Sequence, residues 1–373
     1  MTDRSESDLA MHALAQFCID GEPVAAQRFR RGHIQRSYVA ETGTHRYLLQ
    51  RLNDQVFPEL EALSHNVAVV TDHLAGKGLA DTAARPVRSL GGGLLWWQDP
   101  GNAGAGVWRC LHFVDETESH DLCDSPERAF AAARAFGEFQ QALADLDPGL
   151  LQPTLPDFFD PIVRHRQLET ARAQASSARL DQAQSALGFV DGNTALIQTW
   201  EQLVDSGSMP DRVLHGDTKL NNVLFRRESV EAVCVVDLDT CMSGWSGYDI
   251  GDLVRFTAAS APEDERDLSK VFTDLDLYRS LVAGYLTGAR FLTKSEVQAV
   301  PLSSQIVTMT IGMRFLADFL NGDQYFAIDR EGQNLDRARV QFRLVESMQE
   351  RVQDLCDPLP ASVRAAAREL IAL

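Results

Sequence analysis

Two short polar segments that follow apolar strands constrain this chain more than any other feature of its sequence. The first carries His215, Asp217 and Asn222, and the second carries Asp237 directly after the apolar run Ala232–Val236. Transfer of a phosphoryl group from ATP needs a carboxylate that accepts the proton of the attacking hydroxyl, and amide and carboxylate oxygens that hold Mg²⁺. The spacing therefore predicts phosphoryl-transfer chemistry with ATP and Mg²⁺ as cofactors. The alternative is a polar hairpin in which these residue types meet by chance.

Each polar residue of these segments receives a role. Asp217 is the candidate catalytic base, because it lies on a loop after a strand, where it can orient a hydroxyl and take its proton. Asn222 and Asp237 are the candidate metal ligands. Asp239 is either a supporting ligand or a turn residue, and Lys219 either neutralises phosphate or is solvated. His215 is expected to pack under the loop.

The order His-x-Asp-x-x-x-x-Asn, with an aspartate about 20 residues further on, resembles the catalytic and metal loops of the protein-kinase-like fold. The glycine in His-Gly-Asp is more similar to the aminoglycoside phosphotransferase and choline kinase family. This resemblance implies an α+β, bilobal kinase-like fold with a small β-rich N-lobe and a larger, mostly helical C-lobe. In those enzymes the aspartate equivalent to Asp249 braces the catalytic loop, so Asp249 is expected to be structural.

Hydrophobic periodicity gives the same order of elements. Strands are expected at 37–41, 46–52, 85–90, 94–98 and 107–114, and helices at 9–19, 58–76, 126–146, 161–179, 183–204, 278–287, 303–320 and 335–356. The domain boundary is predicted near 115, which divides the chain into an N-lobe at 1–115 and a C-lobe at 116–373. Arg109 and Glu116 flank this hinge and are expected to be solvated.

The nucleotide side follows the kinase pattern less closely. The turn Gly32–Tyr38 takes the place of the loop that covers the phosphates, so Gly32 is a candidate nucleotide contact. Gln50 occupies the position of the expected phosphate-binding lysine, which leaves open how the α- and β-phosphates are held. Glu59 or Glu61 would be the nominal ion-pair partner at that position.

A narrower resemblance covers the chain from about 32 to 348. The segments Tyr47–Phe57, His215–Asn222, Arg314–Phe326 and Asn334–Arg339 resemble the N-acetylhexosamine 1-kinase group, including the unusual glutamine at the lysine position. Members of that group transfer the γ-phosphate of ATP to the anomeric hydroxyl of N-acetylglucosamine or N-acetylgalactosamine.

That resemblance implies sugar contacts from His33, Asp217, Arg314 and Tyr325. Each of these residues except Asp217 also has an alternative, structural role. Arg314 could instead form a buried pair with Asp318 at i, i+4, Tyr325 could be a core aromatic, and His33 could cap a loop.

Composition limits the other classes of function. A net charge of −18 disfavours nucleic acid and anionic membranes as partners. No signal peptide or membrane span is expected, and the six scattered cysteines indicate reduced thiols, so a cytoplasmic enzyme is expected. A kinase of another small alcohol, such as an aminoglycoside or choline-like compound, stays open, as does a catalytically silent module. The sugar epimer, the nucleotide base, the pathway and the oligomeric state stay open too.

Overall fold

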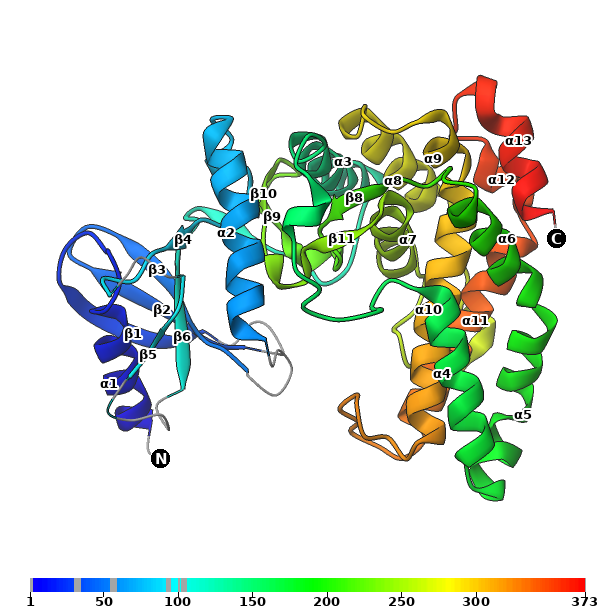
Figure 1. Ribbon diagram of the computed structural model, residues 1–373, viewed down its shortest axis with the longest axis horizontal. Helices are drawn as coiled ribbons and strands as arrows, with labels where there is room; N and C mark the ends of the chain where they lie inside the picture. The colour runs from blue at the N-terminus through cyan, green and yellow to red at the C-terminus, as the bar shows by residue number, and fades with distance from the viewer. Residues whose placement is uncertain are drawn as a thin grey trace.

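The computed structural model describes residues 3–29, 35–53, 59–91, 95–99, 101 and 106–372. Its N-terminal part is a twisted antiparallel sheet with one helix packed on it (Figure 1). The elements of this part are α1 (Asp3–Leu14), β1 (Pro23–Phe29), β2 (Arg36–Thr42), β3 (Arg46–Arg51), β4 (Pro86–Val87), β5 (Trp97–Gln98) and β6 (Val107–His112). The strands run in the order β1-β2-β3-β6-β4, and β5 pairs with β6.

The sheet has a small core of its own. Alternate residues of β3 and β6 point to opposite faces, and Tyr47, Leu49, Trp108 and Cys110 fill the face that α1 covers. The other face of the same strands is turned away from this core, and it carries the nucleotide-side residues described below.

Helix α2 (Leu60–Gly76) lies between the sheet and the helical part of the chain (Figure 1). Its apolar residues recur at helical spacing, and Leu63, Val67, Val70 and Leu74 belong to the core of the larger part. Helix α2 therefore falls within the predicted N-lobe by its position in the sequence, but its apolar residues pack into the core of the helical part. The boundary near 115 stays a prediction.

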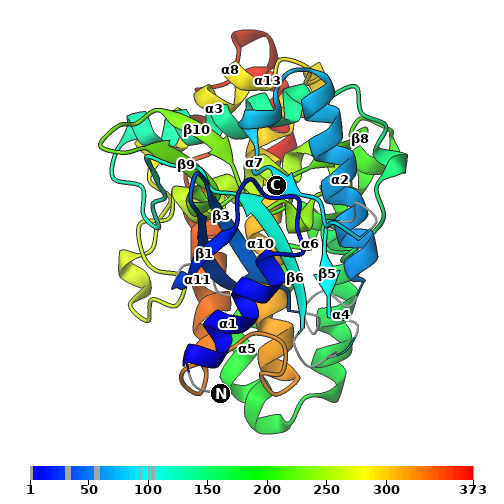
Figure 2. The same ribbon diagram turned by 90° about the vertical axis from the view of Figure 1, so that its left-hand side faces the viewer.

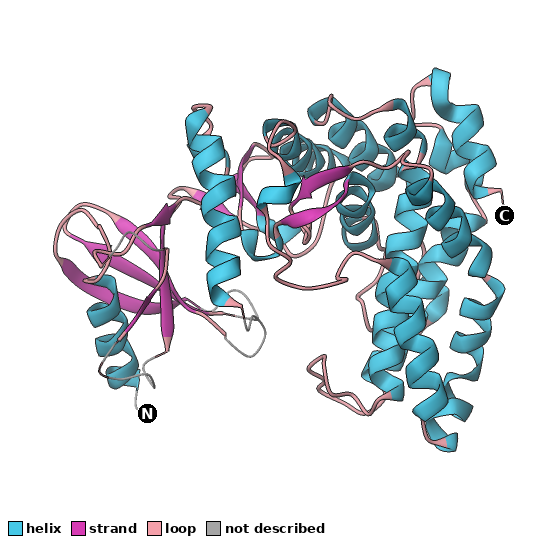
Figure 3. Cartoon of the chain, in the orientation of Figure 1, coloured by secondary structure: helices cyan, strands magenta, loops and turns pink. Residues whose placement is uncertain are grey.

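The remainder is mostly helical, with two small sheets on the side that faces α2 (Figure 3). Its strands are β7 (Thr117–Glu118), β8 (Asp211–Leu214), β9 (Val223–Arg226), β10 (Ala232–Val235) and β11 (Met242–Trp245), paired as β10-β9-β7 and β11-β8. Its helices are α3 (Pro126–Ala142), α4 (Pro161–Gln174), α5 (Ser177–Gly192), α6 (Thr194–Asp205), α7 (Ser246–Thr257), α8 (Leu275–Gly288), α9 (Lys294–Gln298), α10 (Val300–Leu320), α11 (Gln333–Gln349), α12 (Val352–Cys356) and α13 (Ala361–Ile371).

Helix α10 is the axis of this part. It is buried along most of its length and packs against α4, α7 and α11 (Figure 2). A helix covered on all sides shows no polar face in its sequence. The predicted α+β, bilobal kinase-like fold is confirmed.

Several elements differ from the prediction. Strand β1 and helices α7, α9 and α13 were not expected, and two expected helices are divided. The helix expected at 183–204 is divided between α5 and α6, and the one expected at 335–356 ends at Gln349 and restarts at Val352 as α12. Nearly every residue of α7 is buried, including the charged residues Asp249, Asp252 and Arg255, so its charged residues do not mark a solvent-exposed face. Within the described ranges, no helix is both long and apolar enough to cross a membrane.

Candidate active site

The catalytic loop joins β8 to a short 3-10 helix, η4 (Leu220–Asn222), and then to β9. Asn222 donates from its amide nitrogen to the carbonyl of Asp217 at 2.8 Å and to the carboxylate Oδ2 of Asp217 at 3.0 Å. Lys219 forms an ion pair with the other carboxylate oxygen of Asp217 at 2.8 Å. The predicted base and one predicted metal ligand are therefore in direct contact, and Oδ1 of Asn222 has no protein donor among the described residues.

Charge keeps Asp217 ionised. Burial opposes ionisation, but the neighbouring charge of Lys219 and its hydrogen bond outweigh it, so the pKa of Asp217 is lowered from its ordinary value. The same contact raises the pKa of Lys219 against the effect of burial. Asp217 keeps about a quarter of its side chain exposed, at 25 %, so it can be reached by a hydroxyl in its proton-accepting form.

Helix α7 braces the loop from beneath. The carboxylate of Asp249 is fully buried and accepts the backbone N–H groups of His215 at 2.8 Å and Gly216 at 2.9 Å. The amide of Gln140 donates to it at 2.7 Å. One turn later, Asp252 accepts the backbone N–H of Thr218 at 3.1 Å. These bonds support the structural reading of Asp249, because they fix the backbone on both sides of Asp217.

His215 ties the catalytic loop to the metal loop. Its Nε2 lies 2.9 Å from the carbonyl oxygen of Val236, and its Nδ1 accepts the N–H of Asp217 at 3.3 Å. Burial between the rings of Phe136 and Phe139 lowers the pKa of His215, which favours the neutral ring. This is the packing role expected for His215.

Gly216 is the residue on which the loop turns. Its φ is +81°, and a Cβ there would lie 2.6 Å from the carbonyl oxygen of Thr240 and 2.7 Å from the ring of Phe159. Both the backbone conformation and the space exclude a side chain. The glycine of the His-Gly-Asp motif is thus explained by its contacts.

Asp237 emerges after β10, at the start of the 3-10 helix η5 (Leu238–Thr240). The N–H of Val236 donates to the carbonyl of Asn222 at 2.9 Å, so the strands bring the two predicted metal-ligand positions together. Asp237 itself is in the left-handed region, with φ 63° and ψ 62°, a strained conformation that is common at functional sites.

The residues present fit a magnesium ion. Burial, followed by the negative charges of Asp239 and Asp217, raises the pKa of Asp237. Asp237 keeps an exposed face, so water screens part of this repulsion. A divalent cation would relieve the surplus of negative charge. Within the described ranges no group of three or more histidine, cysteine, aspartate or glutamate side chains forms a metal site. One carboxylate with one amide oxygen suits Mg²⁺, which keeps several waters and also binds substrate phosphates.

Asp239 forms the contact between the sheet and the helical part. Arg109 of β6 donates to both of its carboxylate oxygens, and the contact to Oδ2 is 3.0 Å. Gln35 donates to the same Oδ2 at 3.1 Å, and Gln50 accepts the Nε–H of Arg109 at 2.8 Å. The prediction that Arg109 is solvated was wrong, since only 8 % of it is exposed. A charge within the apolar strand, opposite Gln50, was the available signal.

The other residues of the N-lobe that were predicted to contact substrates add little to the described site. Gly32 and His33 lie outside the described residues. Gln50 lies on β3 where expected and also donates to the hydroxyl of Ser37 at 3.0 Å. Glu59 and Glu61 are exposed, and neither forms an ion pair with a described residue.

The acceptor side is built around Arg314 of α10. Its guanidinium lies 4.6 Å from the ring centre of Phe158, 5.4 Å from that of Phe326 and 5.9 Å from that of Tyr325. Tyr325 is 66 % exposed, so its reading as a core aromatic was wrong. The guanidinium of Arg314 therefore packs against aromatic rings, and the residue stays partly exposed to solvent.

The alternative pairing of Arg314 with Asp318 was also wrong. The Asp318 carboxylate instead accepts the backbone N–H groups of Gln324 at 2.9 Å, Tyr325 at 2.8 Å and Phe326 at 2.9 Å. Asp318 therefore folds the loop after α10 and sets the position of Tyr325.

Two further residues of this side were not identified from the sequence. Arg164 of α4 is close enough to Arg314 that burial and then the charge of Arg314 lower its pKa. Tyr248 of α7 has its ring centre 6.2 Å from that of Phe158, the ring that packs against Arg314, and burial is the main cause of its raised pKa. Tyr248 thus links the acceptor side to the catalytic loop. Only folding brings α4, α7 and α10 together, so no local pattern could show it.

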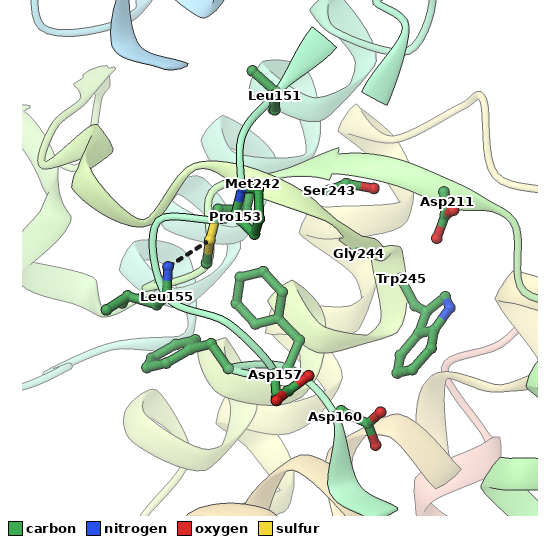
Figure 4. A pocket seen from close by; sticks show the side chains of 12 residues that line it. Leu151, Pro153, Leu155, Asp157, Asp160, Asp211, Met242, Ser243, Gly244 and Trp245 are labelled. Atoms are coloured by element: carbon green, nitrogen blue, oxygen red, sulfur yellow. Dashed lines mark hydrogen bonds between the residues drawn. The ribbon is translucent and has the colours of Figure 1, made fainter. Parts of the chain in front are cut away.

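A cavity of about 250 Å³ lies beside β11 (Figure 4). Leu151, Asp157, Asp211 and Trp245 are among its lining residues. Phe159 also lines it and packs against Gly216, so the ring stands between this cavity and the catalytic loop. Phe158, whose ring packs against Arg314, lines it as well, so the cavity borders the acceptor side.

Comparison with known proteins places the chain in a family. The model of the phosphotransferase enzyme family matches residues 25–281. Among solved structures, a microcompartment-associated aminopropanol kinase has a TM-score of 0.58 at 16% identity, over 93% of this chain and 98% of that one. An aminoglycoside phosphotransferase from Alicyclobacillus acidocaldarius has a TM-score of 0.55 at 15% identity, over 96% and 95%.

A choline kinase from Cryptosporidium parvum has a TM-score of 0.54 at 13% identity, over 90% of this chain and 92% of that one. At such identities these structures show the fold alone. The family match covers well over half of the chain and confirms the prediction of an enzyme of the phosphotransferase class. The chain therefore belongs to the phosphotransferase enzyme family.

Proposed function

We propose that this phosphotransferase uses ATP to phosphorylate a hydroxyl group of a small, hydroxyl-rich acceptor that carries no positive charge. The observation that carries the proposal is the direct contact of Asp217 with Asn222, on a loop whose strands lead to Asp237. This arrangement offers a proton acceptor and oxygen ligands within one rigid frame, as transfer to an alcohol requires.

In the proposed reaction the acceptor hydroxyl lies against Asp217. Its oxygen forms a bond to the γ-phosphorus while the bond from that phosphorus to the β-phosphate oxygen breaks, and the proton passes to Asp217. The lowered pKa of Asp217 makes it a weak base, which suits a loose transition state in which orientation matters more than basicity. Lys219 holds the carboxylate in place before the acceptor binds.

Asn222 and Asp237 are the proposed ligands of Mg²⁺, which when bound neutralises charge on the phosphates. The oxygen of Asn222 is available because its nitrogen is bound to Asp217. Asp237 is oriented by its unusual backbone conformation. The same proposal divides the chain near residue 115. The N-lobe before this boundary covers the nucleotide, and the C-lobe after it carries the acceptor pocket.

The acceptor is proposed to be an N-acetylhexosamine that is phosphorylated at its anomeric hydroxyl. Arg314 and Arg164 give this side of the site two positive charges, which disfavour amines such as aminoglycosides, choline and aminopropanol. Guanidinium N–H groups can donate to ring and hydroxyl oxygens at fixed geometry, and exposed Tyr325 offers an aromatic face. His33 is kept as a proposed sugar contact on the resemblance alone.

The decisive experiment is a screen of ADP formation over free N-acetylhexosamines, other hexoses, choline, aminopropanol and aminoglycosides. We expect turnover with N-acetylhexosamines and a product whose ³¹P spectrum shows an anomeric phosphate. Turnover with amines alone would overturn the acceptor assignment and leave the kinase assignment standing.

The alternative to an enzyme is a catalytically silent module that only binds its ligands. Its support is the glutamine at position 50, and the intact set of Asp217, Asn222 and Asp237 disfavours it. A Mg²⁺-dependent rise in melting temperature with ATP, but no ADP formation with any acceptor, would favour it.

A further inference from the structure

The face of the sheet that looks toward the helical part carries a cation on an unexpected strand. Protein kinases place a lysine on their third strand against the α- and β-phosphates and orient it with a glutamate. Here β3 has Gln50 at that place. Arg109 of β6 is its cross-strand partner in register, so both side chains leave the same face of the sheet, opposite the core that Trp108 and Cys110 fill.

The guanidinium of Arg109 is held in one orientation by two neighbours. Gln50 accepts its Nε–H at 2.8 Å, and Asp239 accepts one N–H from each terminal nitrogen. An arginine has five N–H groups, so each terminal nitrogen keeps one N–H without a protein acceptor among the described residues. A planar fork with two free donors matches phosphate oxygens.

The electrostatic surroundings place this cation at the metal loop. Arg109 and Lys219 are the positive groups that act on Asp237. Lys219 is already paired with Asp217 of the catalytic loop, whereas Arg109 belongs to strand β6 of the sheet. Asp239 and Asp237 raise the pKa of Arg109 against the effect of burial, so it stays charged.

We propose that Arg109 is a nucleotide-binding residue that contacts the non-transferred phosphates, in the role that a lysine on the third strand has in protein kinases. Gln50 and Asp239 are then the residues that position it. Gln35, which donates to Asp239 at 3.1 Å and accepts the N–H of Asn53 at 2.7 Å, joins the end of the predicted phosphate-covering turn to the same carboxylate. This inference rests on the proposed use of ATP.

The test measures binding by calorimetry for Mg·ADP and for adenosine, which lacks phosphates. In Arg109→Gln we expect the affinity for Mg·ADP to fall by at least ~10-fold, as for a lost charge-assisted contact, while adenosine binding stays within about twofold of wild type. The KM for ATP should rise with it, and the KM for the acceptor should change little. Arg109→Lys should lie between the two.

The double variant Arg109→Gln/Gln50→Lys moves the cation to β3 and should recover a large part of the lost Mg·ADP affinity. It also serves if the single variant fails to fold. Arg212→Gln is the matched control, because it breaks another arginine–carboxylate pair, with the buried Glu296 at 3.0 Å. It should lower the melting temperature without a change in the ratio of the ADP and adenosine affinities.

Equal losses of ADP and adenosine affinity in Arg109→Gln, or no recovery in the double variant, would make Arg109 purely structural and overturn the inference. If wild type binds and turns over ATP while Arg109→Gln binds Mg·ADP unchanged, only the inference fails. If wild type binds no nucleotide at all, the proposed function fails and the inference with it.

Discussion

The catalytic loop and the nucleotide side of the site are held by different kinds of contact. The loop around Asp217 is fixed by backbone N–H groups that donate to buried carboxylates of α7, all within the helical part. The sheet reaches the metal loop through side chains, with Arg109 and Gln35 on Asp239. The first arrangement is set when the helical part folds, whereas the second depends on how the sheet lies against it. Acceptor chemistry and nucleotide capture should therefore respond differently to mutation.

The largest effect is expected from the metal loop, where both regions meet. Asp237→Ala removes a ligand at which phosphate charge is neutralised, and we expect turnover to fall by at least ~10³-fold at any workable Mg²⁺ concentration. Chelator should abolish activity in wild type, and Mg²⁺ or Mn²⁺ should restore it. Asp205→Ala, an exposed aspartate on α6, is the control. Phosphoryl transfer that resists chelator would contradict the assignment.

The next effect concerns the base itself. Asp217→Asn keeps the shape of the side chain but cannot take a proton, so we expect kcat to fall by at least ~10²-fold with an unchanged melting temperature. Exposed Asp181→Asn should keep full activity. A folded Asp217→Asn variant with near-normal turnover would remove Asp217 from the mechanism.

The brace of the catalytic loop can be weakened separately. In Asp249→Asn, one oxygen becomes an NH₂ group that faces a backbone N–H, so we expect a loss of about 2–3 kcal/mol in the free energy of unfolding and a lower kcat. Nucleotide affinity should stay close to wild type, because Arg109 is untouched. Exposed Asp267→Asn is the control. Unchanged stability would mean that the loop does not depend on α7.

The acceptor side gives a smaller, selective effect. Arg314→Lys keeps the charge but loses the fixed fork of donors, so we expect KM for the sugar to rise by roughly 10-fold while KM for ATP changes little. Steady-state kinetics with each substrate varied in turn measures both. Arg343→Lys, at a partly exposed arginine of α11, should change neither. Equal rises in both KM values would move Arg314 out of the acceptor pocket.

The smallest effect is a pH dependence of metal binding. Burial, followed by the charges of Asp239 and Asp217, raises the pKa of Asp237 to about 7. Below that pH the bound proton must leave when Mg²⁺ binds, so affinity should fall as pH falls, and above it affinity should be flat. Calorimetry of Mg·ADP binding in two buffers should show proton release at about pH 6 and none at about pH 8.5. Equal release at both would exclude this titration.

The sequence predicted what depends on local order and missed what depends on contacts between distant segments. The spacing of Asp217, Asn222 and Asp237 is local to one strand–loop–strand unit, so it could be read directly. Arg109 could not be placed, because its partner Asp239 is 130 residues away and meets it only when the sheet docks. Arg164 and Tyr248 join the acceptor side for the same reason.

The close packing of α7 on α10 has a consequence for how acceptor preference could diverge. A Cβ at Gly251 would lie 2.5 Å from the carbonyl oxygen of Ser303, so this contact sets a fixed spacing between the two helices. Helix α7 carries the carboxylates beneath the catalytic loop, and α10 carries Arg314. Residues of the 321–326 loop can therefore be exchanged during evolution to suit new acceptors without a change in the spacing between α7 and α10.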